Sequence, residues 1–257
     1  MYLFRKPWIF LTPLVVLAAL VMVRLGIWQL DRLEQRRTFN AQVLSQIDQP
    51  PLVLSADTLP EDWQALAFRS VVAEGVFDFE HQVVLGNQEH AGRMGVHLLT
   101  PLRIAGTGSV LLVDRGWVPY EDWQSDSLTQ YDQPGAVRVE GMLAAGQSNY
   151  GIKDCIAEGI DPALTPELWC VDTAYLSSQT PYALPPAYII QAPTQDAGEE
   201  TVPYRALPHI EINEGPHLSY AIQWFSFAIL LLAGYPFFVY REMQARTHHD
   251  ASLPSQE

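Results

Sequence analysis

The chain has 257 residues, 48% of them hydrophobic and 17% charged, a composition that excludes an intrinsically disordered protein. Its formal net charge is -14, from 15 Lys or Arg against 29 Asp or Glu. A protein that neutralises phosphates needs a surplus of basic residues, so the charge argues against nucleic acid as a partner.

The first predicted element is an apolar stretch near the start of the chain. Trp8–Val23 contains no charged residue, and the apolar run continues after Arg24. About 20 helical residues cross a bilayer, and Arg24 can extend its guanidinium to the headgroups. A cleaved secretory signal is the alternative, because two basic residues precede the run, but no small-x-small cleavage pattern ends it. We therefore assign residues 1–30 to an N-terminal tail and a first transmembrane helix.

The chain then changes its periodicity. Apolar residues at helical spacing over 30–47 indicate that the first helix continues beyond the membrane, until Pro50 and Pro51 end it. Short runs rich in β-branched residues then predict strands over 70–79, 82–86, 96–102, 109–113, 136–143 and 187–191.

Turn-forming residues and one helix cap complete this middle region. Segments 89–95 and 106–108 are expected to connect neighbouring antiparallel strands. Asp172 is placed to cap a short helix over 173–179. The result is a β-rich domain over 31–216, either a small barrel or a sandwich, and the sequence does not decide between the two.

The second apolar stretch, His217–Tyr240, contains no Asp, Glu, Lys or Arg, carries Trp and Tyr at its flanks, and is followed by Arg241. A buried helix of a soluble protein is the alternative, but two such runs in one chain favour a membrane hairpin. The predicted fold class is thus an α+β membrane protein in which two transmembrane helices hold the β-rich domain.

Two spans place both termini on one side of the bilayer. Residues 31–216 contain ten Lys or Arg and 26 Asp or Glu, a net charge of -16, and long domains translocate largely regardless of charge. Basic residues in both tails favour cytoplasmic termini, with 241–257 as a polar cytoplasmic tail and the main domain outside the cytoplasm. Few residues precede the first span, which leaves no room for a mitochondrial transit peptide, so we expect a bacterial plasma membrane.

The two cysteines, Cys155 and Cys170, fall in the domain that we place outside the cytoplasm. A structural disulfide is the favoured interpretation, and it would stabilise the fold by about 3 kcal/mol on the chain-entropy model. A metal or redox site would require further ligands or a C-x-x-C spacing, and the sequence has neither. A membrane-bound thiol–disulfide oxidoreductase remains the enzymatic alternative.

One histidine stands out by its position. His217 begins the second span, and Tyr220 and Trp224 follow at i+3 and i+7, so the three side chains share one helix face. That face could receive a flat macrocycle with the imidazole as axial ligand of haem iron. Anchoring in the headgroup region is the commoner role of such residues, and the residues alone favour it. We expect surface positions for His81, His90, His97, His248 and His249.

Sequence motifs of common enzymes are absent. There is no G-x-S-x-G, no Walker loop, no G-x-G-x-x-G and no H-E-x-x-H. Acidic residues are plentiful, but in an acidic domain paired carboxylates are more often solvated than catalytic. We therefore expect a protein that is not an enzyme.

Three blocks of sequence resemble the surfeit locus family (Surf, or Shy in yeast) of cytochrome c oxidase assembly proteins. The first, LGIWQLDR at 25–32, ends the first span, and the third, HLSYAIQWF at 217–225, enters the second. The second block combines VLGN at 84–87, TPL at 100–102 and VDRGWVP at 113–119. The order and spacing of the blocks relative to two apolar stretches extend the resemblance over nearly the whole chain.

The resemblance implies a membrane-anchored factor that binds haem a and helps deliver it to oxidase subunit I, with His217 as iron ligand and Trp224 and Tyr220 beside the macrocycle. Its implied partners are subunit I, other assembly factors and the lipid bilayer, with haem A synthase as a further candidate. A haem-independent scaffold for oxidase subunits is the alternative. Arg32 and Arg115 could pair with acids of the domain or with haem propionates, and structural pairing is the favoured role.

Overall fold

The computed structural model of the chain describes residues 6–147, 155, 165–194 and 201–251. These residues form two compact units. We call Met1–Ala41 with Ile212–Glu257 the helical unit, and Gln42–Glu211 the barrel unit.

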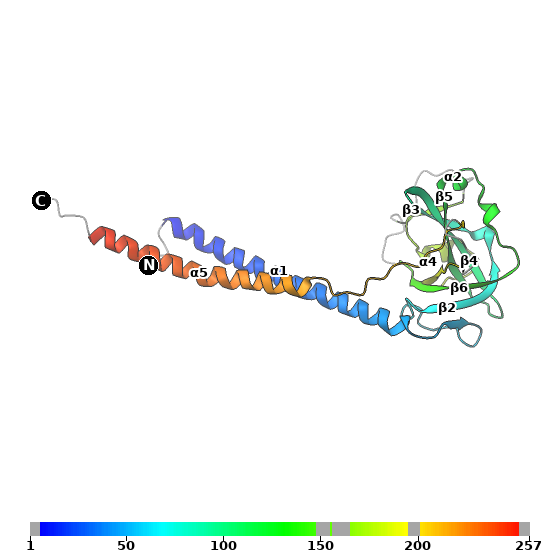
Figure 1. The fold of residues 1–257 in the computed structure, drawn as a ribbon, viewed down its shortest axis with the longest axis horizontal. Helices are drawn as coiled ribbons and strands as arrows, with labels where there is room; N and C mark the ends of the chain where they lie inside the picture. The colour runs from blue at the N-terminus through cyan, green and yellow to red at the C-terminus, as the bar shows by residue number, and fades with distance from the viewer. Residues whose placement is uncertain (1–5, 148–154, 156–164, 195–200, 252–257) are drawn as a thin grey trace. The chain divides into compact units, whose positions relative to one another are not determined.

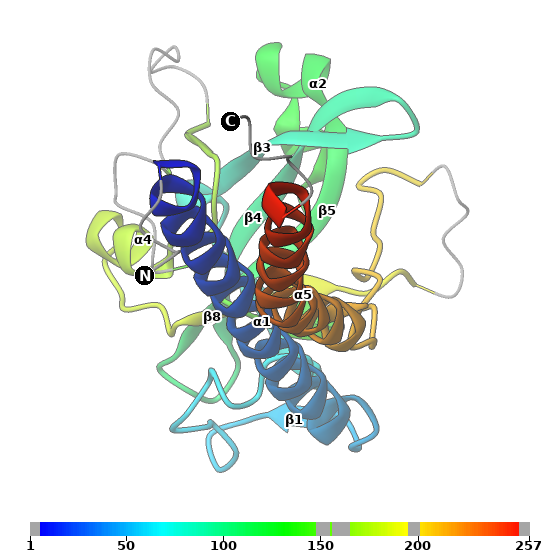
Figure 2. The ribbon, with the colours of Figure 1, turned by 90° about the vertical axis from the view of Figure 1, so that its left-hand side faces the viewer.

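The helical unit is built from two long antiparallel helices, α1 (Lys6–Ile47) and α5 (His217–Ala251). They lie side by side in both ribbon views (Figures 1 and 2). The helices meet through small residues that are almost fully buried: Ala19, Gly26, Ala221 and Ala228. Small residues allow two helix backbones to approach closely, which is how helices associate in an apolar solvent.

Large apolar side chains cover the outside of this helix pair. Phe10 is 78% exposed, Ile229 65% and Leu230 68%, which is unfavourable in water over so large a surface. Both helices are long and apolar enough to cross a membrane. Two such helices are therefore confirmed, and the helix predicted over 30–47 is continuous with the first of them.

The barrel unit contains a closed ring of five strands. They are β2 (Ser70–Phe77), β4 (Arg93–Ile104), β5 (Val110–Pro119), β6 (Ala136–Ala145) and β8 (Ala187–Gln191). The hydrogen-bonded order is β2-β6-β8-β5-β4, and the pairing of Gly75 with Ile104 returns β4 to β2. The domain is therefore a barrel and not a sandwich, because the five strands close into a ring that has no free edge.

Three further strands extend this ring. β3 (Val83–His90) pairs with the first half of β4, β7 (Glu167–Leu168) adds to β3, and β1 (Leu52–Leu54) adds to β2. Short helices α2 (Tyr120–Gln124) and α4 (Thr173–Gln179) and the 3-10 turns Phe79–His81 and Leu128–Tyr131 complete the described elements.

The core explains why the first four residues of β5, Val110 to Val113, form an uninterrupted apolar run. Leu111 and Val113 point into a cluster built from all five ring strands, whereas Val110 and Leu112 belong to a second cluster that includes Leu176 of α4. The strand is buried on both faces, so it does not alternate between apolar and polar residues.

Most local expectations are confirmed. The turn at 106–108 connects β4 to β5, and Asp172 caps α4 by accepting hydrogen bonds from the amides of Ala174 and Tyr175. The connection of antiparallel strands predicted over 89–95 is confirmed, but it is shorter than expected, because β3 and β4 continue through most of that segment. They meet at Ala91 and Gly92, which both have positive φ, as a two-residue hairpin turn requires.

Candidate functional site

The first residue of α5, His217, contacts the other helix of the helical unit. Its Nδ1 lies 2.8 Å from Oε1 of Gln29 on α1. An amide oxygen accepts hydrogen bonds, so in the neutral ring this contact favours the tautomer with the proton on Nδ1, in which Nε2 has a free lone pair. The imidazole is half-buried. The contact therefore fixes the ring and leaves one nitrogen able to bind a metal.

Tyr220 and Trp224 follow His217 on successive turns of α5. Tyr220 is 47% exposed, and the half-buried indole of Trp224 meets the ring of Phe227 edge to face, with centroids 6.2 Å apart. The structure thus offers an imidazole and two aromatic side chains on one helix, with the phenol facing outward. Binding of a macrocycle by them stays a prediction.

The same end of the helical unit is held by two further contacts. The guanidinium of Arg37 forms two hydrogen bonds to the Glu214 carboxylate, at 2.9 and 3.0 Å. Gly26 packs so closely that a Cβ built on it would lie 2.6 Å from the ring of Phe225. Sequence reasoning missed Gln29, Gly26 and Glu214 as parts of this site, because no spacing within one segment shows a contact between two helices.

The two arginines singled out from the sequence, Arg32 and Arg115, both contact other residues of the chain. Arg32 donates to Gln35 and lies over the ring of Trp28. Arg115 is fully buried, donates to Gln82 and to the carbonyl of Tyr131, and packs against two phenylalanine rings. Burial lowers the pKa of Arg115 to about 10, so it stays protonated at neutral pH. A role of Arg115 with haem propionates is wrong, since no solvent-borne group reaches its side chain.

Three histidines expected at ordinary surface positions are half-buried and have partners. His97 places Nδ1 2.8 Å from Asp114, and His81 places Nδ1 3.1 Å from Asp78. The His90 ring stacks on Tyr204 with centroids 3.7 Å apart. All three imidazoles keep part of their surface exposed, as expected, but sequence reasoning missed their partners, which come from distant parts of the sequence or from a turn.

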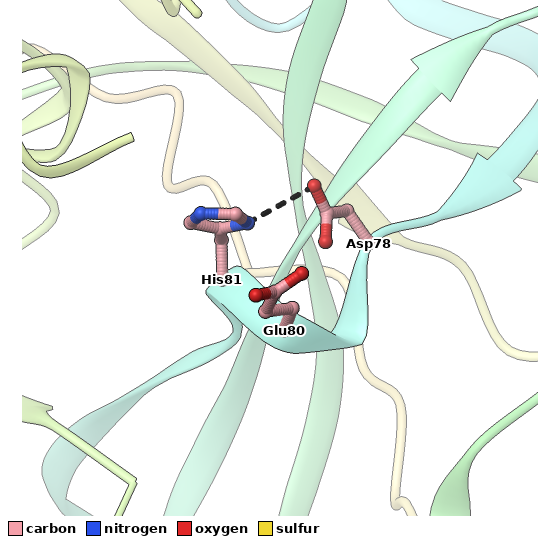
Figure 3. A group of neighbouring side chains, drawn as sticks. All are labelled: Asp78, Glu80 and His81. Atoms are coloured by element: carbon pink, nitrogen blue, oxygen red, sulfur yellow. Dashed lines mark hydrogen bonds and ion pairs between the residues drawn. The ribbon is translucent and has the colours of Figure 1, made fainter. Parts of the chain in front are cut away.

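Asp78, Glu80 and His81 form the one group with metal-ligand geometry among the described residues, with ligand atoms within 4.8 Å (Figure 3). Asp78 also accepts from Arg103 at 2.5 Å and from Tyr182 at 3.0 Å. Burial raises the pKa of Asp78, but the hydrogen bonds from His81, Arg103 and Tyr182 outweigh it and hold that pKa below its usual value. The carboxylate is already neutralised by a cation, so the group is a structural network.

The structure joins Cys155 to Cys170 in a disulfide, with Cα atoms 5.0 Å apart. Both cysteines are buried in the barrel unit. The described chain contains no other cysteine.

The chain is similar to proteins of one family along most of its length. The sequence profile of the SURF1 family matches residues 16–229. An uncharacterised SURF1-like protein of Mycobacterium bovis is 27% identical over 98% of this chain and 91% of its own length. The cytochrome oxidase assembly protein SHY1 of Saccharomyces cerevisiae is 30% identical over 40% of this chain and 26% of its own length. Surfeit locus protein 1 of Mus musculus is 26% identical, over 46% and 43% respectively. The chain therefore belongs to the SURF1 family.

Proposed function

We propose that this chain is a membrane-anchored assembly factor for cytochrome c oxidase that binds haem a and helps deliver it to subunit I. Family membership and the name of the yeast relative support the assembly role. One observation carries the haem role. Nδ1 of His217, the first residue of an apolar helix, lies 2.8 Å from Oε1 of Gln29, a contact that in the neutral ring favours Nε2 as the metal-binding nitrogen.

The residues of this site fit an iron porphyrin held as cargo. Nε2 of His217 would bind the haem iron, and the contact of Nδ1 with Oε1 of Gln29 would orient the ring. Tyr220 and Trp224 supply flat apolar surface beside the macrocycle. A single imidazole on an exposed helix surface holds the haem weakly enough for transfer to the oxidase.

Because both helices bury their apolar surfaces in lipid, each crosses the membrane once and the two termini lie on the same side. Both termini lie in the cytoplasm, and the barrel unit lies outside the bacterial plasma membrane, where an oxidising compartment maintains the disulfide. A green fluorescent protein fused to the C-terminus should fluoresce, and alkaline phosphatase inserted at the exposed turn near Thr107 should be active. The reverse pattern contradicts the topology.

The cellular test uses a strain that lacks this gene and is complemented with variants. His217→Ala should lower the haem a content of the oxidase in isolated membranes, because the ligand is lost. His209→Ala is the matched control, since it removes an exposed imidazole of the barrel unit, and it should complement fully. Full complementation by His217→Ala, with the protein present at normal levels, would instead support a haem-independent scaffold.

A further inference from the structure

The barrel unit carries an open groove with a volume of about 670 Å³. Gly86 of β3, Met94 of β4, Tyr120 of α2, Glu167 of β7 and the adjacent Trp169 line it. We call it the Glu167 groove. No function described above uses these residues.

The carboxylate in this groove has no counter-charge among the residues that the structure describes. Glu167 is half-buried and packs against the backbone of Gly86, where a Cβ would collide with Oε1 and lie 2.8 Å from Cγ. Burial raises the pKa of Glu167. Within the described parts of the chain, no hydrogen bond or ion pair reaches its carboxylate. A partly desolvated, unpaired carboxylate costs free energy that a bound cation would offset.

The walls of the groove suit an organic cation. Trp169 is 62% exposed and Met94 is 52% exposed, while Tyr120 is partly exposed. Aromatic faces attract cations, and a planar guanidinium both stacks on such a face and donates two hydrogen bonds to a carboxylate. Tryptophan, tyrosine and arginine are the residues most enriched where protein partners bind each other most strongly.

The charge of the barrel unit favours the same ligand class. Residues 42–211 contain seven Lys or Arg and 23 Asp or Glu, a net charge of -16. Such a surface attracts basic partners over long range and repels acidic ones. Arg93 is the basic residue next to Met94 in sequence. Its Nη2 lies 3.8 Å from Oε2 of Glu121, so its charge is paired with Glu121.

We infer that the Glu167 groove binds an arginine side chain presented by a protein partner. The guanidinium donates to the Glu167 carboxylate and stacks on Trp169, and the thioether of Met94 covers its aliphatic stem. This site is independent of haem binding at His217, so the failure of one proposal leaves the other standing.

The test uses the full chain in a non-ionic detergent, labelled with ¹³C at the methionine methyl groups. Met94 reports on the groove, and Met142, which is 7% exposed in the barrel, reports on the fold. Met94→Leu assigns the groove signal. The probe is N-acetyl-arginine amide, and N-acetyl-citrulline amide is its uncharged isostere. We expect a saturable shift of the Met94 signal with a Kd on the order of 1 mM for the arginine probe, and none for citrulline.

Three substitutions distinguish binding in the groove from general electrostatic attraction to the barrel unit. Glu167→Gln should weaken binding at least about tenfold, because it removes the charged acceptor. Glu61→Gln removes one exposed charge of the barrel unit outside the groove and should change the Kd less than about twofold. Trp169→Leu, which keeps the charge and removes the aromatic wall, should also weaken binding. An unchanged Met142 signal shows that each variant is folded.

Three results would overturn the inference. Equal shifts with the citrulline probe would show that charge plays no part. Undiminished binding by Glu167→Gln and Trp169→Leu, or equal weakening by Glu61→Gln, would show that the groove is not the site. Equal affinity for N-acetyl-lysine amide would remove the assignment to arginine.

Discussion

Gly26 sets how closely α1 and α5 approach each other, and its replacement tests whether that packing holds the histidine site. A Cβ at residue 26 would lie 2.6 Å from Cε1 of Phe225, whereas ordinary contact begins near 3.4 Å. Gly26→Val adds three carbons there, so the ring or the helix must move. Overpacking of this kind costs about 1–3 kcal/mol, equivalent to a roughly 5- to 150-fold weaker association of the helices. Gln29 lies three residues along the same face and moves with the helix.

The assay measures helix separation directly. Dyes attached at Phe10→Cys and Phe237→Cys, two exposed positions on the helices, report separation through loss of energy transfer as sodium dodecyl sulfate is added. Gly26→Val should separate at lower detergent concentration than the parent. Gly234→Val is the matched control, because nothing lies within 4 Å of a Cβ at that glycine.

A compensating change sharpens the test. Phe225→Ala removes the ring that the new side chain meets, so it should restore most of the stability lost in Gly26→Val. The reasoning is refuted if Gly26→Val and Gly234→Val separate at the same detergent concentration, or if removing the Phe225 ring gives no recovery.

Four other changes have defined outcomes. Asp78→Asn should lower the free energy of unfolding by about 1–3 kcal/mol at neutral pH. Because the folded-state pKa of Asp78 is depressed, this difference should be complete above its ordinary value near 4 and should shrink as pH falls below it, in urea titrations at several pH values. Arg115→Met leaves a buried carbonyl without its donor and should cost about 1–3 kcal/mol, measured by near-ultraviolet circular dichroism during unfolding. Reduction of the Cys155–Cys170 bond should cost about 3 kcal/mol, and equal melting with and without reductant would contradict its structural role. Gln29→Leu should weaken haem a binding about 10- to 100-fold in a titration followed by absorbance, and unchanged affinity would exclude it as the partner that orients His217.

Local patterns in the sequence predict much of this fold. Charge-free runs identify two apolar helices, β-branched runs locate the strands of the ring, and Asp172 marks the start of α4. Each of these signals depends on residues within a few positions of one another. Such local signals do not predict β1 and β7. These strands have three and two residues, too few to show an alternation of apolar and polar side chains.

Local sequence patterns do not predict contacts between residues that are far apart in the chain. Barrel closure depends on the pairing of Gly75, inside β2, with Ile104, the last residue of β4, and no pattern within either segment shows that the two strands pair. The contact of Gln29 with His217 joins residues 188 positions apart, although each belongs to a block that the sequence singled out. Arg115 was expected at the end of a strand, and only the packed core shows that its charge is buried.

The central claim is that Nε2 of His217 is the ligand of haem iron. Pulsed electron paramagnetic resonance of ferric haem a, bound to the purified full chain labelled with ¹⁵N at histidine Nε2, measures this bond directly. We expect a strong coupling to a directly bound ¹⁵N in the parent and in His209→Ala, and its loss in His217→Ala. A bound haem without that coupling, or with the same coupling in His217→Ala, would contradict the account.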